Sequence, residues 1–243
     1  MIKKTVSMMV LFIFSLIMLS SLTSCTKENE FIFDIIDGKK EYRVVSVKEV
    51  FNNDLIIPSE YNNLPVTEIG ERAFAGESKI VSVYIPDSIT VIGREAFDDC
   101  RNLENLRLSN NLEVIPVGMT RNTMIKNIEI PNSVKKIESR AFCTSQIKDL
   151  VIPDSVEYIG YEAFYLSNIE TVIIGKNIKE IQPYAFYYCN SLKSVTFMNP
   201  ENIYLYGVTF KEGFLANNPD KIPFYFLDEQ YACRHWFSKD TQK

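Results

Sequence analysis

Apolar and polar positions repeat along the middle of this chain with a period of 22 or 23 residues. Each unit contains a six-residue segment in which the fourth and sixth positions are apolar and the third and fifth are mostly polar. Because successive side chains of a strand point to opposite faces, this alternation predicts a strand with one buried face. A shorter apolar segment follows and is expected to run back along the other side. The six predicted strands are 80–85, 103–108, 125–130, 147–152, 169–174 and 192–197.

Two further markers recur in phase with these strands. The strand ends in Ile85-Pro86-Asp87-Ser88, and similar runs follow at 130–133 and 152–155. Proline cannot donate a ladder hydrogen bond, so it ends the strand, and Asp-Ser is typical of a turn. An Ala-Phe pair closes the unit at 73–74, 96–97, 141–142, 163–164 and 185–186, with Gly118-Met119 interpreted as the divergent copy. Units of this kind are stable only when stacked, because neighbours share one core.

The markers resemble the treponemal-type repeat of the BspA-like leucine-rich repeat family, over about residues 55–200. The resemblance implies an all-β-rich, right-handed leucine-rich-repeat β-solenoid of about six repeats, curved, with the first strand on its concave side. It also implies a bacterial surface or secreted protein that binds host or other cells. The Ile-Gly pair of the family is present in three units only. Pro116 occupies the glycine position in another unit, and because proline cannot take a positive φ, this position does not require one.

The two ends of the repeat region are expected to be caps. Residues 31–51 alternate around Asp37-Gly38, which predicts an N-terminal β-hairpin over the first open edge. The insertion at 61–66 is predicted to be a loop. Residues 199–220 are predicted to form a long loop, with a partial copy of the Ala-Phe slot at Thr209-Phe210. A last strand at 222–227 and a short helix at 228–238, with Asp228 as its N-cap, would cover the other end.

The first residues have the features of a secretory signal. Lys3 and Lys4 precede an apolar run at 8–19, which is shorter than the roughly 17–25 residues that span a bilayer. Leu22 to Cys25 resembles a bacterial lipobox, which implies cleavage before Cys25 and a diacylglycerol on its sulfur. An ordinary cleavage site with an incidental cysteine, and an uncleaved anchor, remain the alternatives. The expected domains are a signal peptide at 1–24, a lipidated N-terminus with a short tether and cap hairpin at 25–54, repeats at 55–200, and a C-terminal cap at 201–243.

The composition narrows the range of chemistry. The chain has 243 residues, of which 46% are hydrophobic. Its net charge of −5 argues against nucleic-acid binding, because a surface that binds nucleic acid is basic. One histidine and five cysteines do not suit a multi-histidine metal site or a zinc ribbon. We therefore expect no cofactor, no bound metal and no enzymatic activity.

Two cysteine arrangements bear on that expectation. Cys233 and His235 are two residues apart, and such residues on a helix do not face each other. Cys100, Cys143 and Cys189 are expected to be buried thiols, because their units are too far apart for a disulfide. A bond between Cys189 and Cys233 is left open.

The fifth strand positions form a solvent-facing column in which a partner would be contacted. Val151 and Ile173 are adjacent in this column, although folding requires no apolar residue there. The plainer interpretation is strand propensity, because Val and Ile suit any exposed strand. The candidate partner-binding residues are Tyr84, Arg107, Glu129, Val151, Ile173 and Thr196.

The sequence thus predicts a bacterial lipid-anchored leucine-rich repeat protein that binds a protein or another cell-surface macromolecule. It would mediate adhesion to host or other cells through an extended sheet face. The expected place is the cell surface or outer membrane rather than the periplasm, with the membrane contacted through the N-terminal lipid. The alternative is a structural or assembly lipoprotein of the envelope with no extracellular ligand. The sequence leaves open the ligand, the leaflet and the oligomeric state.

Overall fold

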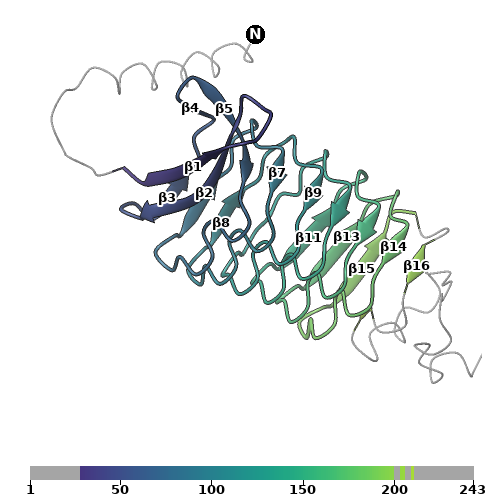
Figure 1. Cartoon of the computed structure of the whole chain (residues 1–243). Coiled ribbons are helices and arrows are strands. Elements are labelled where there is room, and N and C mark those ends of the chain that lie inside the picture. The colour runs from purple at the N-terminus through teal and green to yellow at the C-terminus, as the bar shows by residue number, and fades with distance from the viewer. Residues whose placement is uncertain (1–27, 200–202, 206–208, 211–243) are drawn as a thin grey trace, which may run out of the picture.

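A computed structural model describes residues 28–199, 203–205 and 209–210 of the chain. All regular elements within these ranges are strands, and they wind through about seven stacked coils of about 23 residues. Figure 1 shows the coils side by side along one axis, with a hairpin at the N-terminal end. The predicted all-β solenoid is therefore confirmed. The predicted signal peptide, Cys25, and the strand and helix at 222–227 and 228–238 lie outside the described residues.

The N-terminal cap is the predicted antiparallel hairpin. Strand β1 (Glu30–Ile35) pairs with β2 (Tyr42–Glu49), and Gly38 in the connection has a φ of 75°. Only glycine takes such a φ without a steric penalty from Cβ, which accounts for the Asp-Gly turn signal. Strand β2 then pairs in parallel with β5 (Leu64–Ile69), the next element of the solenoid.

The insertion at 61–66 is a second hairpin, so the prediction of a loop there was wrong. Strand β4 (Glu60–Tyr61) pairs antiparallel with β5. Asn62 and Asn63 turn the chain with φ values of 48° and 61°. Two consecutive positive φ values are typical of the tight turn that joins hairpin strands, and asparagine tolerates them.

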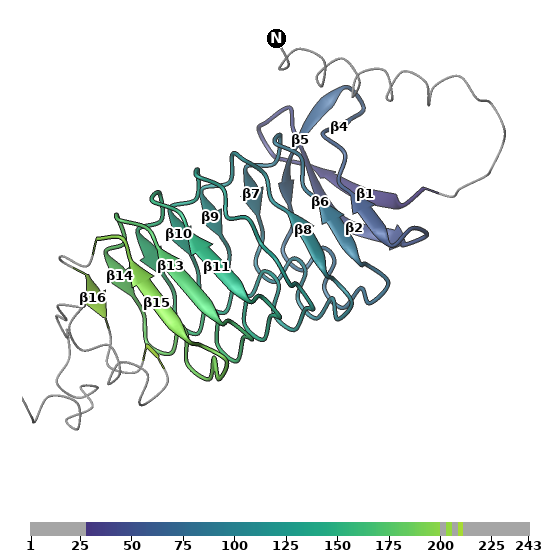
Figure 2. The ribbon, with the colours of Figure 1, turned by 180° about the vertical axis from the view of Figure 1, so that it is seen from behind.

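The long strands of the repeat form two parallel three-stranded sheets. One contains β3 (Asp54–Ile56), β6 (Ser82–Tyr84) and β8 (Asn105–Arg107), and the other β11 (Asp149–Ile152), β13 (Thr171–Ile174) and β15 (Ser194–Phe197). Residues 125–130 contain no strand, so the prediction of a strand there was wrong; an isolated bridge joins Asn127 to Asn105. Figure 2 shows this interruption as a coil without an arrow between β8 and β11.

The short apolar segments form the other side of the solenoid. They pair in parallel from β9 (Val114–Ile115) through β10 (Lys136–Ile137), β12 (Tyr158–Ile159) and β14 (Glu180–Ile181) to β16 (Tyr204–Leu205). Strand β7 (Val91–Ile92) pairs with β5. Strand β16 lies inside the predicted long loop, so the described part of that region continues the repeat.

Phenylalanine rings form ladders through the interior. Phe142, Phe164 and Phe186 stack at centroid separations of 5.4 and 5.1 Å, and Phe210 continues the stack at 5.3 Å. Phe210 is thus in the slot that its sequence context predicted. A second ladder joins Phe74 and Phe97 at 5.2 Å. The two ladders are separated by one coil that has no phenylalanine at this position.

In that coil, the interpretation of Gly118-Met119 as the Ala-Phe copy was wrong by one residue. The N–H of Phe97 donates to the carbonyl of Met119 at 2.9 Å, and the N–H of Thr120 donates to the carbonyl of Ala141 at 3.0 Å. The same bond joins Phe74 to Ala96, so Met119 occupies the alanine slot and Thr120 the phenylalanine slot. Both side chains are fully buried.

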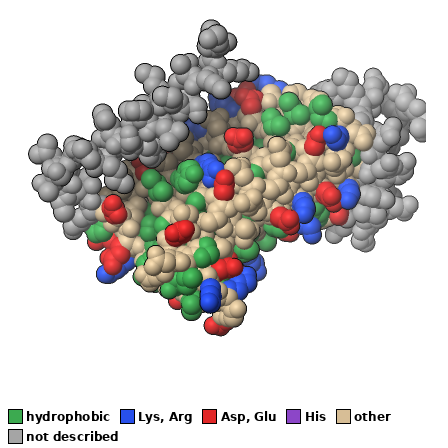
Figure 3. All heavy atoms as spheres, turned by 90° about the horizontal axis from the view of Figure 1, so that it is seen from above, with side chains coloured by type: hydrophobic (Ala, Val, Ile, Leu, Met, Phe, Trp, Pro, Cys, Tyr) green, Lys and Arg blue, Asp and Glu red, His purple; other side chains and the backbone are tan. Residues whose placement is uncertain are grey.

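Charged side chains link neighbouring coils at the surface. Lys135 pairs with Glu113 at 2.8 Å and Lys176 with Asp154 at 2.9 Å, each across one repeat. Figure 3 shows Lys and Arg side chains beside Asp and Glu over the visible face. These pairs are exposed, so each contributes little to stability, with a median of about 0–1 kcal/mol.

Candidate binding face

The candidate face is the outward side of the two long-strand sheets, which is called the sheet face below. Val83, Leu150 and Val172 point into the core from the fourth position of their strands and are buried. The third and fifth positions therefore point to solvent, as the alternation predicted.

The N-terminal half of the sheet face centres on Tyr84 of β6. Tyr84 lies between Ile56 of β3 and Arg107 of β8 in the parallel register. The guanidinium of Arg107 lies 4.7 Å from the centroid of the Tyr84 ring. Arg107 also donates to the carbonyl of Ile85 at 2.5 Å and pairs with Asp87 at 2.8 Å. These contacts hold the guanidinium over the face of the ring, within the distance of a favourable cation–π interaction.

Asp87 is itself held by the next coil. Its carboxylate accepts a hydrogen bond from the backbone N–H of Asn110 at 3.0 Å. This bond, together with the bonds from the Asn110 side chain and Arg107, lowers the pKa of Asp87. The carboxylate is therefore ionised at neutral pH and keeps Arg107 in place.

A shallow groove of about 480 Å³ runs over this half of the face. It is lined by the residues of β3, β6 and β8 and by Asn127. Polar side chains, among them Ser82 and Asn105, form one wall, and Ile56 and Tyr84 supply the apolar surface. The groove can therefore take both polar and apolar groups of a partner.

The C-terminal half of the face centres on Val151 and Ile173. Val151 of β11 pairs with Ile173 of β13, which pairs with Thr196 of β15. Val151 is 55% exposed and Ile173 is 41% exposed. The third positions of the same strands are polar. There the carboxylate of Asp149 accepts a hydrogen bond from the hydroxyl of Thr171 at 2.6 Å, which links β11 to β13.

Five of the six predicted site residues thus lie in two groups. Tyr84 and Arg107 are in contact in the first half, and Val151, Ile173 and Thr196 are neighbours in the second. Glu129 is exposed in the strandless segment 125–130 and belongs to neither group.

Ile56 was missed from the sequence, although it is 64% exposed and extends the fifth-position column by one strand. A signal for it was present. Ile57-Pro58 matches the Ile-Pro marker, which places Ile56 in the fifth position of an additional strand.

The described thiols are poorly suited to nucleophilic chemistry. Burial raises the pKa of Cys100 and Cys189 to about 12 and that of Cys143 to about 11, so each stays protonated at neutral pH. The part of the chain that the structure describes contains no group of three or more potential metal ligands. Among the same residues, no helix has the length and apolar character needed to cross a bilayer. The sheet face offers hydrogen-bonding, charged and apolar groups for non-covalent contact.

Comparison with known protein families identifies the repeat. The model of the BspA type leucine rich repeat region matches residues 48–121 and 119–212. The chain belongs to this family. Leucine-rich repeat families of this type are typically non-catalytic, and their domains generally mediate protein binding. A search of curated proteins finds no match.

Solved structures of leucine-rich repeat proteins show the same fold. A leucine-rich repeat protein of T. pallidum has a TM-score of 0.61 at 22% identity, with 79% of this chain and 86% of that chain covered. A leucine-rich repeat protein from Bacteroides ovatus has a TM-score of 0.58 at 25% identity, with 73% of this chain and 54% of that chain covered. These likenesses concern the fold.

Proposed function

We propose that this protein is a bacterial surface protein, held to the membrane by a lipid on Cys25, that binds a protein partner through its sheet face and so mediates adhesion. The observation that carries the proposal is the pair Val151 and Ile173, which are neighbours in the register of the sheet β11-β13-β15 and are both exposed. Covering exposed apolar side chains with a partner is favourable, roughly in proportion to the apolar area that is removed from water. Ile56 and Tyr84 repeat the pattern in the other half of the face.

The surface location is tested first. Proteinase is added to intact cells, the solenoid is detected by immunoblotting, and a periplasmic protein reports leakage. Loss of the solenoid band with the periplasmic band kept supports surface display. A protected solenoid contradicts it and favours the alternative, a lipoprotein with a structural or assembly role inside the envelope.

The binding face is tested by a double variant, Val151→Lys with Ile173→Lys. Attachment of cells that carry this variant to immobilised extracellular-matrix proteins and to host cells is expected to fall to the level of cells without the protein. The melting temperature should stay nearly unchanged, because both side chains are exposed. The matched control is Val91→Lys, an exposed valine of β7 on the other side of the solenoid. Attachment that is unchanged in the double variant, with display verified, contradicts the assignment of the face.

A further inference from the structure

The third strand positions form a polar column along the sheet face, and much of this column is bonded within itself. The hydroxyl of Ser82 donates to the carboxylate of Asp54, which links β6 to β3. The hydroxyl of Thr171 donates to the carboxylate of Asp149 in the same way in the other half. These four side chains bond one another across adjacent coils, so they do not depend on a partner.

Asn105 and Asn127 are the open part of this column. The isolated bridge makes them neighbours, and both are exposed. Their carboxamides form no hydrogen bond with any other residue that the structure describes. Both line the groove over β3, β6 and β8, and Asn127 belongs to the coil that has no arrow in Figure 2. The groove therefore has two adjacent carboxamides, each with N–H donors and a carbonyl acceptor that a ligand can use.

Tyr84 supplies an aromatic surface in the same groove. The guanidinium of Arg107 lies over its ring, yet Tyr84 remains 46% exposed. Ile56 lies on the other side of Tyr84 in the parallel register and is exposed as well. An aromatic ring presents a flat apolar face to a ligand, so C–H groups can pack against it.

The charges of the groove are already balanced. Its ionised lining residues are Asp54 and Arg107, one of each sign. Arg107 is held by Asp87 and by the carbonyl of Ile85, and Asp54 accepts the bond from Ser82. An ionic ligand would find no unpaired opposite charge here, and a charge that loses its water without gaining a partner is unfavourable. The groove therefore suits a neutral ligand.

The spacing of the two carboxamides disfavours an extended peptide that crosses the coils. Groups on one side of a strand repeat every two residues, or about 6.6–6.8 Å, whereas adjacent coils are about 4.8 Å apart. Such a peptide would be in register with one carboxamide and out of register with the other. A pyranose carries several hydroxyls around one compact ring and C–H groups on its faces. Its hydroxyls donate and accept, as the carboxamides do.

We infer that this groove binds a neutral saccharide. A pyranose ring packs on Tyr84, and its hydroxyls bond the carboxamides of Asn105 and Asn127. The groove, of about 480 Å³, falls within the range of about 300–1,000 Å³ for small-molecule sites. The inference gives the N-terminal half of the sheet face a ligand of its own and does not depend on the protein contact proposed at Val151 and Ile173.

The test is an array of immobilised neutral saccharides, with sialylated and sulfated saccharides as charged probes. The neutral set contains glucose, galactose, mannose, fucose and N-acetylhexosamines, as monosaccharides and short oligomers. The purified full chain is expected to bind at least one neutral saccharide. Asn105→Ala with Asn127→Ala should weaken that binding by about tenfold or more, because hydrogen bonds from two carboxamides are lost.

The melting temperature of this double variant should stay nearly unchanged, because both side chains are exposed and form no hydrogen bond with the described residues. The matched control is Asn132→Ala. Asn132 is an exposed asparagine in a turn of the same coil as Asn127, but it does not line the groove. This control should bind the array as the unaltered chain does.

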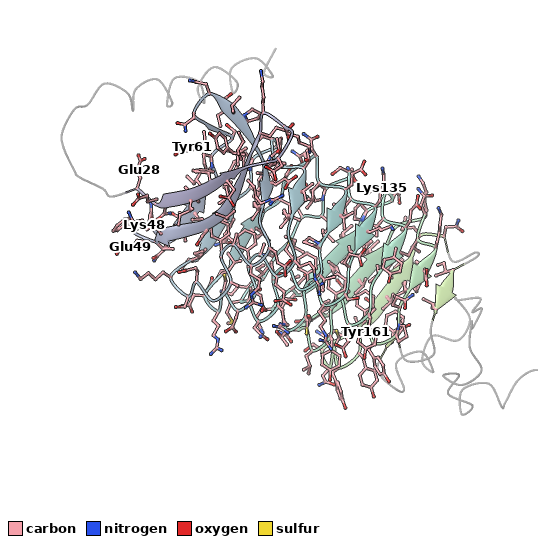
Figure 4. The ribbon with its side chains drawn as sticks, in the orientation of Figure 1. Glu28, Lys48, Glu49, Tyr61, Lys135 and Tyr161 are labelled. Atoms are coloured by element: carbon pink, nitrogen blue, oxygen red, sulfur yellow. The ribbon has the colours of Figure 1, made fainter. Side chains whose placement is uncertain are left out.

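A second set of variants tests the aromatic ring. Tyr84→Ala should weaken binding of the same saccharide, whereas Tyr84→Phe should keep it, because the face of the ring makes the contact. The control is Tyr161→Ala. Figure 4 shows Tyr161 at the edge of the coils, on the side opposite Lys135, and this tyrosine is also exposed.

Any of three results would overturn the inference. The first is an array on which the unaltered chain binds no saccharide, and the second is binding to the charged saccharides alone. The third is binding that survives both the asparagine double variant and Tyr84→Ala. Val151→Lys with Ile173→Lys should leave binding to the array unchanged, so failure of the saccharide site and failure of the proposed protein contact are told apart.

Discussion

Gly160 lies where the backbone of the preceding coil passes very close to its own. A Cβ at this position would lie 2.6 Å from the backbone nitrogen of Ser139, and one at Gly93 would lie 2.3 Å from that of Glu71. Neither glycine has a positive φ, as the presence of Pro116 in the same slot predicted. What these glycines provide is room for a close approach of two backbones, and this could not be deduced from the repeat pattern.

Gly160→Ala is therefore expected to destabilise the solenoid by about 1–3 kcal/mol, as overpacking does. The measurement is the free energy of unfolding in urea. Gly76→Asn is the matched control, since nothing lies within 4 Å of its Cβ position and asparagine tolerates its φ of 80°. Equal stability of the alanine variant and the unaltered protein would show that the coils separate easily at this point.

The buried thiols lead to a second prediction at this scale. With pKa values raised to about 12, Cys100 and Cys189 should resist iodoacetamide at pH 8, because the thiolate is the reactive form. Mass spectrometry should find them modified only after unfolding in urea. Rapid modification of the folded protein at either position would contradict their burial.

At the scale of the element, the third coil departs most from the repeat. It has no long strand, and it exchanges Ala-Phe for Met119-Thr120. A larger residue in the alanine slot accompanies a smaller one in the phenylalanine slot, so the pair keeps the core filled. The hydroxyl of Thr120 is satisfied by the carbonyl of Ala141 at 3.0 Å.

A double-mutant cycle tests this exchange. Met119→Ala alone should destabilise the protein by about 2–5 kcal/mol, because it leaves a cavity. Thr120→Phe alone should destabilise it by about 1–3 kcal/mol, because methionine occupies part of the ring's space. Together they should restore stability in urea unfolding, with a coupling of about 0.5–3 kcal/mol, as residues in contact show. Additive effects would mean that the two side chains do not share a volume.

Most elements could be predicted from the sequence, because every coil buries the same positions. The long strands, the short return strands and the hairpin around Gly38 follow from alternation and turn chemistry. The one-residue error at Met119 was avoidable, because Ile115 precedes it by four residues, as Ile92 precedes Ala96. The hairpin β4–β5 was missed because Asn-Asn was not interpreted as a tight turn.

The candidate face was predicted less completely. Alternation places Val151 and Ile173 outward, but it cannot show that the long-strand sheet is interrupted at 125–130, where the residues keep the apolar pattern of a strand. The groove over β3, β6 and β8 depends on how Arg107 lies on Tyr84, which no pattern of residue types specifies.

For the whole molecule, surface charge is organised as pairs between adjacent coils. Bonds from Lys176, Lys179 and Lys193 lower the pKa of the carboxyl groups of Asp154, Glu157 and Glu170, in that order. A carboxyl group whose pKa is lower in the folded than in the unfolded chain stabilises the folded protein. The stabilisation is fully present at pH values above the pKa of the unfolded chain, which is about 3.9 for Asp and 4.3 for Glu. That contribution is lost as the pH falls through the folded values.

The melting temperature should therefore fall as the pH is lowered from about 5 to about 3, and 1 M salt should weaken the dependence, because the pairs are exposed. A triple variant, Asp154→Asn, Glu157→Gln and Glu170→Gln, should have a smaller slope over this range. An identical slope in the triple variant would assign the acid sensitivity to other groups.

The interruption between β8 and β11 also determines how the stack comes apart. A solenoid is a line of units in which each is coupled only to its neighbours, and such a line separates first at its weakest joint. At the third coil both the long-strand sheet and the phenylalanine ladder are broken. The two sides are joined there by the short strands β9 and β10, by the isolated bridge between Asn105 and Asn127, by backbone hydrogen bonds between the turns, such as that from Thr120 to Ala141, and by the remaining core. Amide hydrogen exchange in mild denaturant should therefore divide the solenoid into two cooperative blocks that meet at residues 125–130, and opening should begin in the middle of the molecule instead of at a frayed end.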